Sequence, residues 1–237
     1  MLYRLCLVLL ALLAATAPAR SKIVRVEIDS RELVLGGKSF GTYGPYDIVH
    51  GRLYFAFDPA NPMNARIVDL QRAPRDSAGH VEAWTTFVVL QPTSPDRARG
   101  IALVEVSNRG TKFSPAYFNR AKSANLDPDK PYAFGDALLM RLGLTVIWIG
   151  WQFDVPDRPG VQRLHVPRAR HVDGSPITGL VRSDWTVDSP AASLALAHRD
   201  HRAYPVANPR KPANILTVRD GREATRRVIS QDRWHFA

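Results

Sequence analysis

Cysteine is almost absent from this chain of 237 residues. The one cysteine, Cys6, lies in the apolar stretch that opens the sequence. If that stretch is removed, the remaining chain has neither a disulfide nor thiol chemistry. We therefore expect packing alone to stabilise the fold.

Long apolar runs are also missing. The opening run, Leu5–Ala15, has about eleven residues, whereas a helix that crosses a bilayer needs about 20. Arg4 precedes this run, and the small residues Ala17 and Ala19 follow it, an order typical of a secretory signal peptide cleaved after Ala19. We expect export to the periplasm or the medium, with no membrane attachment after cleavage. The alternatives are an uncleaved anchor and a buried core helix.

Blocks of like charge are absent, although the formal net charge is +10. The arginines are scattered among aspartates and glutamates, and no nucleic-acid-binding motif accompanies them. No phosphate-binding glycine loop or dinucleotide fingerprint follows a predicted strand, and no calcium-loop spacing is present. We therefore predict neither a nucleic-acid partner nor a cofactor.

The first third of the chain is typical of antiparallel β-structure. Residues 22–28 alternate apolar and polar side chains, and residues 48–57 and 81–90 are rich in strand-forming types. Residues 66–70 predict one further short strand. Gly51 lies inside the second of these segments, where a glycine indicates a bulge or a bend.

The middle of the chain changes character. Ile101–Val106 is nearly all apolar, which predicts a strand covered on both faces. The spacing of apolar residues predicts a helix over Phe134–Leu142, with Asp136 as a cap and Gly143 as its left-handed end. A second buried strand, Leu144–Trp151, follows. We therefore predict a βαβ unit with parallel strands and a right-handed crossover.

Beyond this unit, prolines divide the sequence into short pieces. Residues 161–166, 180–187 and 215–218 predict strands, residues 191–198 a short helix, and residues 208–212 a loop.

A sheet that begins antiparallel and continues into βαβ units is how an α/β-hydrolase fold begins. Three segments, Gly37–Trp84, Glu105–Gly110 and Gly135–Asp154, resemble in that order a bacterial family of alpha/beta hydrolase domain proteins. The resemblance implies a β-rich α/β fold in which residues 20–237 form the N-terminal portion of one hydrolase domain. It also implies hydrolysis of an ester or related acyl bond in a small-molecule substrate.

The order of strands and helix in an α/β-hydrolase fold also places candidate site residues. The loop Asn108-Arg109-Gly110, after the third strand of such a fold, would donate oxyanion-hole N–H groups. Trp151, at the end of the next strand, is a candidate for the substrate cleft. The serine elbow, acid and histidine of the family lie in a continuation beyond this length. We therefore expect a truncated chain that lacks the catalytic serine, is inactive alone and has an exposed sheet edge.

One formal G-x-S-x-G motif centres on Ser39, which makes this serine a candidate nucleophile. A nucleophile elbow needs a buried strand before the serine and a helix after it. Only three apolar residues precede this motif, and the following Thr42-Tyr43-Gly44-Pro45 cannot start a helix. A glycine-rich turn is the favoured interpretation.

Two further hypotheses come from other classes of protein. His198 and His201 form an H-x-x-H pair, which on a helix could hold a metal, but a third ligand is not evident and a solvated helix end explains them as well. The chain could also be an exported, β-rich binding module without catalysis. That alternative predicts a cooperative melt and binding without turnover.

Overall fold

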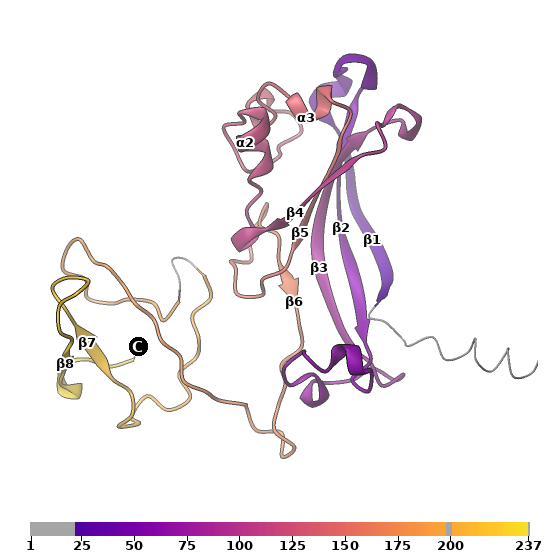
Figure 1. Cartoon of the computed structure of the whole chain (residues 1–237). Coiled ribbons are helices and arrows are strands. Elements are labelled where there is room, and N and C mark those ends of the chain that lie inside the picture. The colour runs from indigo at the N-terminus through magenta and orange to yellow at the C-terminus, as the bar shows by residue number, and fades with distance from the viewer. Residues whose placement is uncertain (1–21, 198–200, 237) are drawn as a thin grey trace, which may run out of the picture. The chain divides into compact units, whose positions relative to one another are not determined.

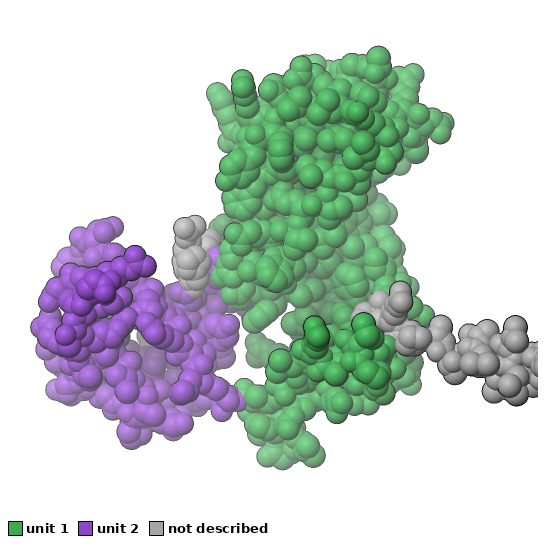
Figure 2. All heavy atoms as spheres, viewed as in Figure 1, with its two compact units in different colours: residues 1–177 green, residues 178–237 purple. Residues whose placement is uncertain are grey.

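The computed structural model describes residues 22–197 and 201–236. The chain divides into two compact units, residues 1–177 and 178–237 (Figure 2). The predicted domain over 20–237 contains both units and stays a prediction, and the predicted signal peptide with its cleavage site after Ala19 lies outside the described residues. Within the described ranges, the structure contains no helix of the length and apolar character needed to cross a membrane.

The first unit is built on a long antiparallel meander (Figure 1). Its strands are β1 (Lys22–Leu33), β2 (Tyr46–Phe57) and β3 (Val81–Pro92), each paired antiparallel with the next. This arrangement confirms the antiparallel prediction for the first third of the chain. The strand predicted at residues 66–70 is wrong, because this segment forms turns that lead into a 3₁₀ turn at Leu70–Arg72.

The bulge expected at Gly51 lies in the neighbouring strand. β2 and β3 pair without interruption, while β1 shifts register between Ile28 and Ser30, opposite Gly51. A Cβ atom on Gly51 would lie 2.3 Å from the Glu27 carbonyl oxygen and 2.7 Å from the Phe87 ring. The glycine therefore permits a close approach of the β1 backbone.

The sheet changes from antiparallel to parallel at its other side. β4 (Ala102–Ser107) and β5 (Thr145–Gly150) pair in parallel, which confirms the predicted parallel strands. The strand order is β1-β2-β3-β5-β4, and the two-residue β6 (Leu164–His165) also pairs with β3. The unit is thus a β-rich, mixed six-stranded sheet, and β4 lies at an edge.

The predicted helix at residues 134–142 is shorter than expected. Only α3 (Leu138–Arg141) is α-helical, because Ala137 has a left-handed backbone with φ 55°. The N-cap is Ala137, which forms no side-chain cap, and the predicted cap Asp136 lies one position earlier, where its carboxylate accepts the Leu138 N–H at 3.1 Å. Gly143, with φ 72°, ends the helix as predicted.

The core lies on one face of the sheet, beneath the segment that joins β4 to β5. This segment contains α2 (Ser114–Asn119) and α3. The buried core residues are Val34, Phe40, Tyr46, Ile48, Val88, Leu90, Leu126, Ala133, Phe134, Ala137, Leu139, Met140, Val146 and Trp148.

The opposite face of β4 is open, so the prediction of a strand covered on both faces is wrong. Val104 and Val106 are 53% and 57% exposed. Both short α-helices of the described residues belong to the β4–β5 connection, which covers only the core face. An apolar sequence alone does not reveal whether a second layer is present.

The second unit contains one small antiparallel hairpin of β7 (Leu216–Val218) and β8 (Arg227–Ile229). β7 confirms the strand predicted at 215–218, and residues 208–212 form a loop as predicted. The strand predicted at 180–187 is wrong, and residues 191–197 are not helical. Leu180 is 97% exposed, so no apolar layer holds this segment as a strand.

Candidate functional site

The loop after β4 is a tight turn at the carboxyl end of the parallel strand pair. Thr111 donates its N–H to the Asn108 carbonyl oxygen at 3.2 Å, and Arg109 and Gly110 have φ values of 53° and 78°. Two positive φ values across such a hydrogen bond are typical of a type I′ turn. Ser107, the last residue of β4, pairs with Gly150 at the end of β5. The turn therefore lies beside the chain that leaves β5.

Arg109 is held in its left-handed conformation by that neighbouring chain. Its N–H donates to the Gln152 side-chain oxygen at 2.6 Å, and its guanidinium donates two hydrogen bonds to the Asp154 carboxylate at 3.1 and 3.2 Å. A non-glycine residue in this conformation costs about 1–2 kcal/mol, which these contacts offset. Such strained residues concentrate at functional sites.

Gly110 is buried beneath the segment that precedes β6. Its carbonyl oxygen accepts the Gln162 N–H at 2.9 Å. A Cβ atom on Gly110 would lie 2.4 Å from a methyl group of Val161 and 2.7 Å from the Gln162 carbonyl oxygen. The turn is thus clamped between the chain after β5 and the chain before β6.

The sequence predicted the turn but not its supporting residues. Gln152 and Asp154 directly follow β5, and their place at the carboxyl end of a parallel pair was the only signal for them. Trp151, the cleft candidate, lies at the same end of β5 and is 55% exposed. It is not one of the residues that line the groove described next.

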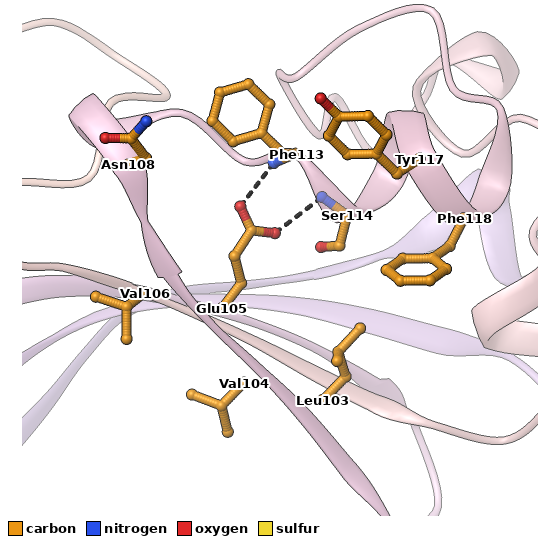
Figure 3. A pocket seen from close by; sticks show the side chains of 9 residues that line it. All are labelled: Leu103, Val104, Glu105, Val106, Asn108, Phe113, Ser114, Tyr117 and Phe118. Atoms are coloured by element: carbon orange, nitrogen blue, oxygen red, sulfur yellow. Dashed lines mark hydrogen bonds between the residues drawn. The ribbon is translucent and has the colours of Figure 1, made fainter.

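A shallow groove of about 490 Å³ lies between β4 and the start of α2 (Figure 3). It is lined by Leu103, Val104, Glu105, Val106, Asn108, Phe113, Ser114, Tyr117 and Phe118. Three of these side chains are aromatic, and only Glu105 carries a charge at neutral pH. The surface is therefore mostly apolar.

Both carboxylate oxygens of Glu105 accept hydrogen bonds within the protein. One carboxylate oxygen accepts the Phe113 N–H at 2.7 Å, and the other accepts the Ser114 N–H and the Trp148 indole N–H, both at 2.8 Å. The indole also donates to the Ser114 hydroxyl at 2.9 Å. Glu105 thus ties the edge strand, the first turn of α2 and the core together. The only feature of the sequence that indicates this role of Glu105 is the presence of a single acidic residue within an apolar strand.

Lys112 is a buried lysine next to this loop. Its side chain is among the most completely buried of the chain, and its ammonium donates to the Gly160 carbonyl oxygen at 2.8 Å. Burial lowers the pKa of Lys112 to about 8, and the Glu105 charge partly opposes that shift. Burial, and secondarily the Lys112 charge, lowers the pKa of His50.

Lys112 gives a testable pH dependence of stability. Its folded pKa of about 8 is below its unfolded value of 10.5, so between these values the unfolded chain holds a proton that the folded chain lacks. Stability should therefore rise by about 2–3 kcal/mol from pH 8 to pH 10. The Lys112→Met variant should lose this rise, as measured by urea unfolding at each pH.

The matched control is Lys130→Met, which changes an exposed lysine and should keep the rise. The lowered pKa of His50 affects the pH dependence of stability only below pH 6.5, the ordinary pKa of histidine. Burial raises the pKa of Tyr46 above its ordinary value of 10.0, and the resulting loss of stability begins only above that pH. Equal pH profiles for the parent and Lys112→Met would contradict the assignment.

The elbow that a nucleophilic Ser39 would need is not formed. Ser39 is exposed in coil between two 3₁₀ turns, and β2 follows where an elbow would need a helix. His201 is buried, whereas His198 lies outside the described residues. The described part of the chain holds no group of three or more His, Cys, Asp or Glu side chains that could bind a metal.

Comparisons of the chain with models of protein families, with curated proteins and with solved structures find no match.

Proposed function

We propose that this chain supplies the oxyanion-loop part of an exported α/β hydrolase that cleaves an ester or a similar acyl bond. The observation that carries the proposal is the turn 108–110 at the carboxyl end of the parallel pair β4 and β5, where such a fold presents oxyanion-hole N–H groups. The sequence resemblance described above supports the same assignment.

The chemistry of the turn fits this role. In acyl transfer a serine, activated by histidine, attacks the carbonyl carbon, and preorganised N–H groups stabilise the negative oxygen that develops. The Arg109 N–H already donates to a carbonyl-type oxygen of Gln152 at 2.6 Å. A substrate oxygen would take the place of this side-chain oxygen. We assign the nucleophile, acid and base to sequence other than the described residues.

The first experiment is to sequence the DNA that follows codon 237, reading all three forward frames. We expect an apolar strand, a G-x-S-x-G elbow, a helix, and then an acid and a histidine. A stop with no such pattern in any frame would reject the hydrolase proposal for this gene.

The second experiment measures hydrolysis of p-nitrophenyl butyrate. The 237-residue chain alone should show no turnover above the buffer rate, and the joined reading frame should show turnover. Exchange of the elbow serine for alanine in the joined protein should abolish that turnover, because it removes the nucleophile. Turnover by the short chain alone would contradict our assignment of the nucleophile.

A second function is favoured by the apolar groove beside β4, which can hold a ligand without any catalytic group. In this alternative the chain is an exported, non-catalytic binding module. It predicts a single cooperative thermal transition, whereas an incomplete hydrolase domain predicts a broad, uncooperative melt. Differential scanning calorimetry separates the two.

A further inference from the structure

We propose that the outer edge of β4 and helix α2 bind an extended, uncharged peptide strand from another polypeptide chain, which adds to the sheet beside β4. The proposal rests on the binding-module function, because in the hydrolase proposal further sequence adds to the sheet.

The main chain of β4 determines the kind of occupant. Among the described strands, β4 pairs only with β5, so its outer edge presents a row of unpaired N–H and C=O groups. Only another extended backbone can satisfy such a row along its length, which is the basis of peptide recognition by strand addition. β4 has six residues, so a partner of similar length can pair along it.

The two edges of the sheet differ in how they are protected. The β1 edge carries Arg25, Glu27, Asp29 and Arg31, and its pairing with β2 shifts register at two places. Charges and bulges of this kind prevent the addition of further strands. β4 pairs with β5 without a register shift and contains one acidic residue, Glu105, whose carboxylate is engaged internally. Only β4 is an edge suited to pairing.

The side chains around β4 determine the character of the peptide. Val104 and Val106 are more than half exposed, and Phe113, Tyr117 and Phe118 rise from α2 and its start, as Figure 3 shows. Because the Glu105 carboxylate already accepts three N–H groups of the protein, most of its hydrogen-bonding sites are occupied. A charged peptide side chain would lose water there without a partner. Uncharged, β-branched side chains complement this surface.

The test uses the mature chain and a fluorescein-labelled, acetylated and amidated synthetic peptide that alternates threonine and valine over seven residues. Fluorescence anisotropy should show saturable binding. A peptide of equal length with lysine and glutamate at the valine positions should bind about tenfold more weakly or less, because its charges are desolvated.

Two substitutions locate the site. Val106→Lys should weaken binding about tenfold, because it places a charge on the open face of β4 beside the added strand, and Tyr117→Ala should weaken it about fivefold by removing an apolar wall on the α2 side. The matched control is Ile28→Lys on the β1 edge, since Ile28 and Val106 are exposed to 58% and 57%. It should leave binding unchanged. Calorimetry on each variant confirms that it still folds.

Each other outcome has a defined meaning. An uncooperative melt of the parent chain would reject the binding module and this inference together. A cooperative melt with no peptide binding would reject this inference alone. A stable dimer in sedimentation that Val106→Lys dissociates, without peptide binding, would show that a second copy occupies the edge. Equal weakening by Ile28→Lys would place binding at the other edge.

Discussion

The Gly110→Ala variant is expected to lose about 2–4 kcal/mol of folding free energy, from a positive φ and an overpacked contact together. Gly110 has φ 78°, a conformation that an L-residue with a Cβ atom adopts at a cost. The added methyl group would also lie 2.4 Å from Val161 and 2.7 Å from the Gln162 carbonyl oxygen. The Gln162 carbonyl oxygen belongs to the backbone, so it can move away only if the chain segment around Gln162 moves with it.

The matched control is Gly79→Ala, because Gly79 has φ 83° and no atom near the position of its added Cβ. It should cost about 1 kcal/mol, which represents the backbone conformation alone. Guanidinium unfolding of both variants measures the difference. Equal losses would show that segment 158–162 does not pack on the turn, and the clamp around Arg109 would then lose its support.

The Glu105→Ala variant is expected to lose about 2–4 kcal/mol, because it leaves three N–H donors without their acceptor. The donors are the Phe113 and Ser114 main-chain N–H groups and the indole of Trp148, which is fully buried. The indole retains the Ser114 hydroxyl as a partner, so the loss falls mainly on the first turn of α2. Urea unfolding followed by near-ultraviolet circular dichroism measures it.

The control for this substitution is Glu82→Ala, which removes an exposed carboxylate from β3 and should change stability by less than about 0.5 kcal/mol. Glu105→Gln should lie between the two, since its one amide oxygen can replace only part of the carboxylate. A Glu105→Ala loss no larger than that of the control would show that water satisfies these donors. The hydrogen-bonding sites of the Glu105 carboxylate would then be open to a ligand in the groove.

The parts of the fold that followed from the sequence are those with local causes. Alternating and β-branched residues predicted β1, β2 and β3, and the parallel pair β4 and β5 followed from two apolar runs separated by a connecting segment. The helix end at Gly143 was also predicted correctly, because it depends on the residues of one turn.

The errors arose where local pattern and tertiary environment disagree. Ala137 adopts a left-handed conformation that its residue type does not signal, and this shortens α3. Residues 180–187 have strand-forming side chains, yet Leu180 is almost fully exposed and this segment forms no strand. The apolar sequence of β4 led to the prediction of a strand covered on both faces. The same sequence is equally compatible with the observed strand, which is covered on one face.

For the candidate site, the sequence placed the turn 108–110 but could not place its partners. Gln152 and Asp154 are separated from Arg109 by more than forty residues, and only the parallel pairing of β4 with β5 brings them together. Glu105 likewise reaches the start of α2 and the buried Trp148 through the fold, and Lys112 reaches Gly160 in the same way.

The sequence by itself determined the strands β1 to β5, the antiparallel-to-parallel change and the turn at the end of β4, because hydrophobic period and turn residues act over a few positions. The tertiary structure decided that β4 is an edge, that one face of it is open and that the Glu105 carboxylate is engaged. These properties depend on which segments pair or pack across the sheet. The conformational preferences of neighbouring residues do not specify those long-range contacts.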